Sequence, residues 1–181
     1  MGAGGSSLEA DSSSVQLHKI RLVVTPLFEG SILMQGTAYH SSVLVGGYEV
    51  WFSDDGISKA YSAGHKCVSH LHLTGKTEII DLGESRLSAW SLIEILRPFF
   101  MPDTYDMLKK NCNSFTDCAL FFLLGQRLDD RYKTLEQLGA TIDESFGLVR
   151  MLTLGGYAPN PRAAHFNTAL VLQRLANAKA K

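Results

Sequence analysis

Two strand-like runs joined by a pair of glycines constrain the fold of this chain more than any other segment. The runs cover residues 39–45 and 48–52, and both are rich in β-branched and aromatic residues. Gly46 and Gly47 stand between them, and such a pair favours the tight primed turns that join antiparallel strands. The segment therefore predicts a β-hairpin in which the numbers of cross-strand partners sum to 93, with His40 near the start of its first strand.

Strand patterns dominate the first half of the chain and helix patterns the second. A strand is expected over 15–25, the hairpin over 39–52 and one or two strands over 71–82, whereas helices are expected over 89–97 (with Ser88 as N-cap), about 113–124, 135–154 (one or two) and 163–178. Strands followed by helices indicate an α+β domain.

The ends of the chain differ in composition from its middle. Residues 1–14 are rich in Gly and Ser and contain little to bury, which predicts a disordered N-terminal tail. The globular domain is expected over 15–154. Residues 155–181 are expected to form a Gly- and Pro-containing linker and a C-terminal amphipathic helix.

The first residues also match a lipidation pattern. Gly2 follows the initial Met, and Ser6 stands at the position that N-myristoylation prefers. A flexible leader without modification explains the same residues, so both interpretations stay open. A single acyl chain would give only weak, reversible membrane association.

Bulk composition excludes several classes of protein. The 181 residues are 45% hydrophobic and 19% charged, as in a soluble globular protein, and the net charge of −1 argues against a nucleic-acid binder. No apolar run is long enough to cross a bilayer, and no secretory signal opens the chain. Three scattered cysteines do not make a disulfide framework. A cytoplasmic location is expected, with the nucleus or a membrane surface as further possibilities.

One of these cysteines stands at the start of a predicted helix. Cys112 lies between Asn111 and Asn113, either of which can cap the helix, and Gly125 is a typical stop signal. The positive end of a helix dipole favours thiolate over thiol. Cys112 is therefore a candidate nucleophile and His40 is a candidate base, since such pairs are defined by geometry and not by chain order.

These motifs resemble the PPPDE family of permuted papain-fold cysteine peptidases, which includes the desumoylating isopeptidases. The resemblance covers about residues 17–139 and rests on Tyr39-His40-Ser41, Glu49, Phe52, Gly56-Ile57, Ile80-Asp81-Leu82-Gly83 and Tyr105 to Phe115 with its Asn-Cys-Asn core. It implies a permuted papain-like fold, in which a small, mostly antiparallel sheet packs against helices. It also implies a catalytic dyad of Cys112, at a helix N-terminus, and His40, on a strand.

The resemblance implies a thiol isopeptidase that removes SUMO or ubiquitin from substrate lysines, without a cofactor. Its partners would be SUMO- or ubiquitin-conjugated proteins, and homodimerisation is implied only by the family. Two alternatives stay open. The same nucleophile could serve an acyl-protein thioesterase, and the fold could serve as a non-catalytic interaction module.

The residues that would assist the dyad are less well defined. The hairpin register puts Ser53 opposite His40, with Asp54 one step further, and either could orient the imidazole. For the oxyanion, the backbone N–H of Cys112 is the expected first donor and Gln35 is a candidate second donor.

A cluster of His and Cys follows the hairpin. His65, Cys67, His70 and His72 could suggest a metal site, but their spacing matches no zinc pattern closely. We expect no metal here, and interpret the segment as a polar loop that leads into a half-exposed strand carrying His70 and His72. Cys118 is expected to be a packing residue.

Overall fold

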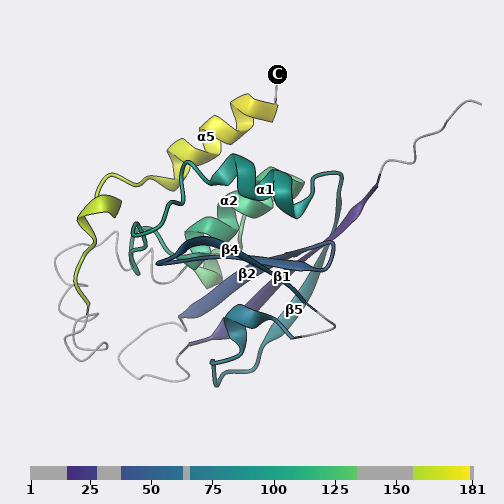
Figure 1. Cartoon of the computed structure of the whole chain (residues 1–181), viewed down its shortest axis with the longest axis horizontal. Helices are drawn as coiled ribbons and strands as arrows, with labels where there is room; N and C mark the ends of the chain where they lie inside the picture. The colour runs from purple at the N-terminus through teal and green to yellow at the C-terminus, as the bar shows by residue number, and fades with distance from the viewer. Residues whose placement is uncertain (1–15, 28–37, 63–65, 134–156, 180–181) are drawn as a thin grey trace, which may run out of the picture.

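The computed structural model describes residues 16–27, 38–62, 66–133 and 157–179. These residues form an antiparallel sheet of five strands, in the order β4-β3-β2-β1-β5, with the α-helices on one face (Figure 1). The expected α+β fold is confirmed. The strands are β1 (His18–Pro26), β2 (Tyr39–Val45), β3 (Tyr48–Ser53), β4 (Gly56–Tyr61) and β5 (Glu78–Ser85); the helices are α1 (Ala89–Leu96), α2 (Cys112–Leu124) and α5 (Thr168–Lys179); and 3-10 turns cover Val68–His70, Asp130–Tyr132 and Pro161–Ala163.

The predicted hairpin and its register are confirmed. Leu44 pairs with Glu49 and Val45 with Tyr48, as a sum of 93 requires. Gly46 has a positive φ of 57°, a backbone conformation that side chains with a Cβ rarely adopt. This register fixes which side chains of β2 and β3 share a face of the sheet.

One expected strand starts later than predicted, and one strand was not predicted. The strand predicted within 71–82 begins only at Glu78, because residues 71–77 form a turn and a loop. In that loop Leu71 is exposed, so its alternation with Leu73 does not mark a buried strand face. The strand β4, which was not predicted, is an edge strand on which Lys59 and Tyr61 are exposed.

Helix starts agree with the capping residues. Ser88 accepts a hydrogen bond from the N–H of Ser91 at the start of α1, as expected of an N-cap. The C-terminal helix α5 begins at Thr168, later than expected, because Pro161–Ala163 forms a 3-10 turn. The helices expected over 135–154 and the tail over 1–14 lie outside the described residues.

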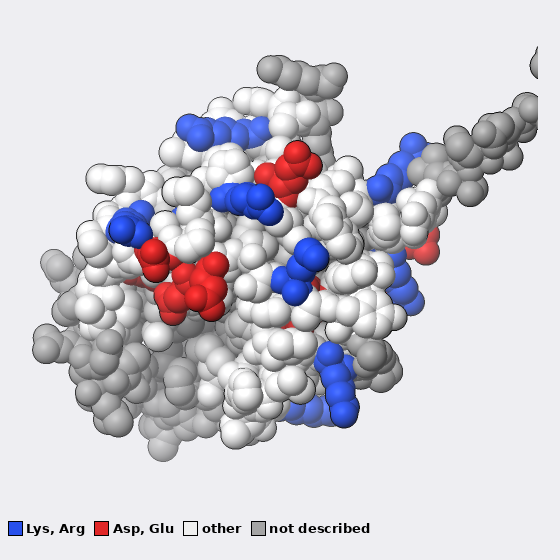
Figure 2. Space-filling model, in the orientation of Figure 1, with Lys and Arg blue, Asp and Glu red and all other residues white. Residues whose placement is uncertain are grey.

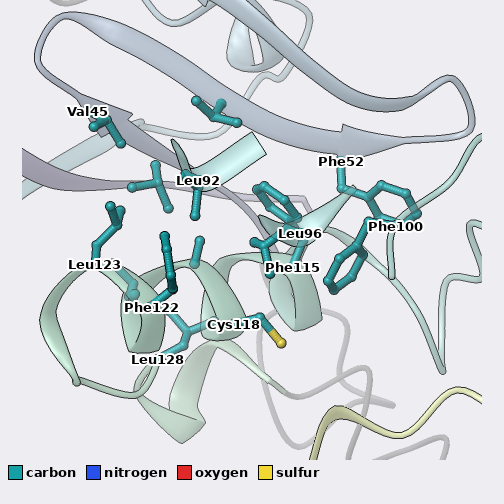
Figure 3. Packing of buried hydrophobic residues seen from close by; sticks show 14 of the residues in the cluster. Val45, Phe52, Leu92, Leu96, Phe100, Phe115, Cys118, Phe122, Leu123 and Leu128 are labelled. Atoms are coloured by element: carbon teal, nitrogen blue, oxygen red, sulfur yellow. The ribbon is translucent and has the colours of Figure 1, made fainter. Parts of the chain in front are cut away.

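The core lies between the sheet and the helices α1 and α2. Three phenylalanine rings meet there: Phe52 of β3, Phe115 of α2 and Phe100, which lies between α1 and α2. Their contacts are edge to face or stacked, with centroid distances of 5.0 to 6.3 Å (Figure 3). Cys118 is fully buried in the same core, which confirms its packing role, and burial is the main cause that raises the pKa of its thiol.

The C-terminal segment belongs to the same packing unit. Val171, Leu172 and Leu175 of α5 are buried in the core cluster that includes α2. Before α5, Phe166 packs edge to face on Phe100, with ring centroids 5.4 Å apart. The segment is therefore held by apolar contacts that a surface tail would not make.

The visible surface carries charges of both signs. In Figure 2, Lys and Arg side chains are dispersed over the face that is shown, with one gathering of acidic side chains among them. Among the described residues, no helix combines the length and the apolar character needed to cross a bilayer.

Candidate active site

The N-terminus of α2 is fixed by a reciprocal cap. Oδ1 of Asn111 accepts hydrogen bonds from the N–H groups of Asn113 and Ser114, both at 2.9 Å. In return, the Ser114 hydroxyl accepts from the N–H of Asn111 at 2.9 Å. This capping box makes Asn111 the N-cap and Cys112 the first helical residue, so the thiol sits at the positive end of the helix dipole.

The surroundings of Cys112 are polar although the residue is only 3% exposed. Tyr105 lies against it, and its phenol hydrogen-bonds both to the thiol and to the backbone N–H of Cys112. Burial is the main cause that raises the pKa of Tyr105, with the thiol as a further cause, so the phenol remains protonated. The N–H expected as an oxyanion donor is therefore directed to the same polar side as the sulfur.

Asn113 ties the start of α2 to the strand that carries His40. Its Oδ1 accepts a hydrogen bond of 2.7 Å from the hydroxyl of Ser41. Its Nδ2 donates to the carbonyl oxygen of Tyr39 at 3.1 Å. The residue that follows Cys112 is thus bonded to both chain neighbours of His40, and the two predicted site segments lie side by side.

The imidazole of His40 lies on the other face of β2 from Ser41, because side chains alternate along a strand. There its Nε2 is 2.9 Å from the hydroxyl of Ser69, and its ring centroid is 4.6 Å from that of His70. Burial lowers the pKa of His40 to about 4, so the ring is neutral near pH 7. The structure brings the chain segments that carry Cys112 and His40 together through Asn113, whereas it holds the His40 ring by Ser69 on the other face of β2.

Behind Ser69 lies a fully buried carboxylate. Oε1 of Glu49 accepts hydrogen bonds from the hydroxyls of Ser69 at 2.5 Å and Ser42 at 2.9 Å. Its Oε2 accepts a longer one, 3.3 Å, from the N–H of Ser69. Within the described part of the chain, no Lys or Arg forms an ion pair with it. Hydroxyls and an amide therefore supply most of what offsets its loss of water.

His70 completes this polar cluster. Its Nε2 is 3.0 Å from the hydroxyl of Ser42, and its Nδ1 is 2.7 Å from that of Thr25. Burial, followed by the proximity of His40, lowers the pKa of His70 to about 3. The expectation that His70 lies on a half-exposed strand was wrong, since it ends a 3-10 turn and is 5% exposed.

The other members of the His and Cys cluster do not join His70. Cys67 is buried against Val23 and Leu44, and burial is the main cause that raises the pKa of its thiol. His72 is exposed and His65 lies outside the described residues. Among the residues that the structure describes, no group of His, Cys, Asp or Glu has the arrangement of a metal site.

The orienting group of His40 was missed by sequence reasoning. Ser53, expected opposite His40, pairs with Gly56 of β4, and the described pairing of β2 with β3 ends at Val43. Glu49 could have been found, because the predicted register places it opposite Leu44 and so on the face of His40. The contact with Ser69 comes from the 3-10 turn Val68–His70, and no local pattern indicates it. Gln35 and Gly2 lie outside the described residues.

The loop that carries Tyr105 is held by the C-terminal segment. Asp106, in this loop, accepts hydrogen bonds from the hydroxyl of Tyr157 at 3.2 Å and from the N–H of Asn160 at 2.8 Å. The side-chain amide of Asn160 donates to the carbonyl oxygen of Tyr105 at 2.9 Å. Residues after position 156 therefore help to fix the contact between Tyr105 and Cys112.

A buried lysine lies in the same region. The ammonium of Lys110 donates to the hydroxyl of Thr104 at 2.6 Å. It also lies 5.2 to 5.7 Å from the ring centroids of Phe52, Phe100 and Phe166, which are cation–π distances. Lys110 is 5% exposed, and burial lowers the pKa of its amine to about 8.

Comparison with known proteins agrees with the motifs and the fold. The family model described as "PPPDE putative peptidase domain" matches residues 11–152. No curated protein matches the chain significantly. The matched region includes both Cys112 and His40, and it ends before the C-terminal segment that contacts the Tyr105 loop. On this match, which covers most of its length, the chain belongs to the PPPDE peptidase family.

Proposed function

We propose that the protein is a thiol isopeptidase that removes a ubiquitin-like modifier, SUMO or ubiquitin, from lysine side chains of other proteins. One observation carries the proposal: a cysteine begins an Asn-capped helix that is bonded, through Asn113, to the residues on both sides of His40. Membership of a peptidase family supports acyl transfer as the chemistry. The choice of an isopeptide bond rests on the resemblance to desumoylating enzymes.

In the proposed reaction, Nδ1 of His40 takes the proton from the Cys112 thiol, because Nε2 is engaged by Ser69. The thiolate attacks the carbonyl carbon of the isopeptide bond and forms a tetrahedral intermediate. The imidazolium then gives its proton to the leaving lysine amine, which leaves a thioester on Cys112. Water hydrolyses the thioester and restores both groups.

The proton transfer requires the imidazole and the thiol to meet around the end of β2. His40 is the second residue of that strand, so only Tyr39 stands between it and the strand's beginning. The His40 ring keeps its bond to Ser69 through Nε2, so the Cys112 thiol would approach Nδ1 around this end of the strand. We therefore place the reacting atoms at the Tyr39 end of β2.

Two features of this region support the proposed reaction: a donor for the oxyanion and a cleft for the substrate's peptide tail. The N–H of Cys112 now bonds to the Tyr105 phenol, and a substrate oxyanion would take over this donor. A cleft of about 310 Å³ opens beside Tyr39. It is lined by Val24, Pro26, Tyr39, Lys76, Glu78, Arg131 and Tyr132. Its mixed apolar and charged lining suits an extended peptide tail better than a fatty acyl chain.

The test is covalent labelling with modifiers that carry a C-terminal electrophile. The full chain is incubated with ubiquitin and SUMO propargylamides, and the adduct is mapped by mass spectrometry. We expect an adduct on Cys112 that disappears in Cys112→Ala, falls strongly in His40→Ala, and persists in the matched control Cys67→Ala.

Two results would contradict the proposal. Labelling that survives Cys112→Ala would show that another residue is the nucleophile. Turnover of a palmitoyl thioester, without labelling by any modifier and without cleavage of a Gly-Gly amide substrate, would favour the thioesterase instead.

A further inference from the structure

The buried cluster around Glu49 determines which groups donate and which accept in the hydrogen bonds around His40. Glu49, as a carboxylate, can only accept hydrogen bonds. The hydroxyl of Ser69 lies 2.5 Å from Oε1 and donates its single proton there. The same hydroxyl lies 2.9 Å from Nε2 of His40, and it has no second proton to give. Nε2 of His40 must therefore carry a proton and donate it to Ser69.

This chain of donors fixes the tautomer of the imidazole. A neutral ring has one N–H, so a protonated Nε2 leaves Nδ1 with its lone pair. Burial keeps His40 neutral near pH 7, in agreement with a ring that has one base nitrogen. Nδ1 is thus the atom that can take the proton of the Cys112 thiol.

The second half of the cluster follows the same rule. Ser42 donates its proton to Glu49, so it accepts from Nε2 of His70, and Nδ1 of His70 accepts from Thr25. Thr25 in turn lies 2.7 Å from the hydroxyl of Thr77, which can donate to it. Every proton position is therefore consistent with one carboxylate at the centre and two neutral rings.

We propose that Glu49 and Ser69 are positioning residues for His40: the carboxylate orients the Ser69 hydroxyl, and this hydroxyl sets the tautomer and the orientation of the base. The inference rests on the proposed function for its catalytic meaning. When Nδ1 takes the thiol proton, the Nε2–H bond to Ser69 becomes charge-assisted and so strengthens. The pair acts as an indirect third member of the Cys112–His40 dyad.

The experiment measures the tautomer directly, without substrate. In uniformly ¹⁵N-labelled full-length protein at pH 7, two-bond ¹H–¹⁵N correlations of the imidazole rings report which nitrogen of His40 is protonated. We expect protonation at Nε2 in the wild type. Ser69→Ala and Glu49→Gln should both lower the population of this tautomer, whereas Ser69→Thr, which keeps a hydroxyl, should restore it. The matched control Ser62→Ala, which removes another buried serine hydroxyl of this region, should leave it unchanged.

Kinetics supply the second readout. The rate constant for modifier labelling at Cys112 should fall about 10- to 100-fold in Ser69→Ala, as expected for the loss of a hydrogen bond to a charged group. The inference is overturned if the wild-type ring is protonated at Nδ1, or if Ser69→Ala leaves the tautomer unchanged. A chain that reacts with no modifier but shows the expected tautomers would refute the proposed function and leave the positioning of His40 intact.

Discussion

Replacing Lys110 by Met tests how tightly the loop before Cys112 is packed. The Lys110 amine is enclosed by three phenylalanine rings, of which Phe166 comes from the C-terminal segment, and its side chain bonds to Thr104. Burial lowers its pKa from 10.5 to about 8. Since one pKa unit corresponds to about 1.4 kcal/mol, holding the charged amine in this site costs about 3 kcal/mol at neutral pH.

The sign of the pH effect follows from the two pKa values. Between pH 8 and 10.5 the unfolded chain binds the Lys110 proton more tightly than the folded chain. The free energy of unfolding therefore rises with pH in this window, and by pH 10 the contribution of Lys110 should reach about 2 kcal/mol. Below pH 8 the full cost is present. Lys110→Met lacks this contribution at every pH.

The assay is urea unfolding of the wild type and Lys110→Met at pH 7.5 and pH 10. The wild type should gain about 2 kcal/mol relative to the variant between the two pH values. At pH 7.5 the variant should be at least as stable as the wild type, because an apolar side chain of similar length fills the same site. The exposed neighbour gives the control Lys109→Met, which should show neither effect. Equal pH dependence in the wild type and Lys110→Met would refute the reasoning.

Three further perturbations test other parts of the structure. In the folded protein His70 has a pKa of about 3 and is neutral, so the unfolded chain binds its proton more tightly. The free energy of unfolding should therefore fall as the pH drops from 6.5 to 4.5, and urea unfolding should show a fall about 2 kcal/mol larger than in His70→Gln. Asp117→Asn should lower the free energy of unfolding by about 3 kcal/mol in the same assay, since the buried carboxylate binds Arg127 through two hydrogen bonds. The control Asp129→Asn, at an exposed position, should lower it hardly at all. Equal losses in the two variants would contradict the role of Asp117. Phe166→Ala should lower modifier labelling of Cys112 by releasing the loop it covers, and unchanged labelling would show that the C-terminal segment does not support the site.

Local signals were sufficient for the parts of the fold that neighbouring residues determine. The glycine pair fixed the turn at Gly46 and hence the register of the hairpin. Ser88 marked the start of α1, whereas Asn111 and Asn113 were both candidates for the cap of α2 and the structure selects Asn111. The sequence placed Cys112 at the start of this helix, and the cap at Asn111 makes it the first helical residue.

Features that depend on distant contacts could not be read from local patterns. Ser69 reaches His40 only because its 3-10 turn packs against the sheet, and nothing near Ser69 in sequence indicates that contact. His70 was placed on an exposed strand because alternation cannot distinguish a strand from a short turn that buries one ring. Glu49 is an intermediate case. The predicted register places it on the face of His40, but the hydroxyl of Ser69, which helps to stabilise its buried carboxylate, could not be predicted.

The pairing of Cys112 with His40 is tested most directly by the alkylation rates of the three cysteines in one molecule. The full chain is treated with iodoacetamide at pH 7, and the modification of Cys67, Cys112 and Cys118 is followed by mass spectrometry. Cys67 and Cys118 serve as internal references, because burial raises the pKa of both thiols. The account predicts that Cys112 reacts at least about tenfold faster than either reference, and that His40→Ala removes most of this difference. A Cys112 that reacts no faster than Cys118, or that keeps its rate without the imidazole, would contradict it.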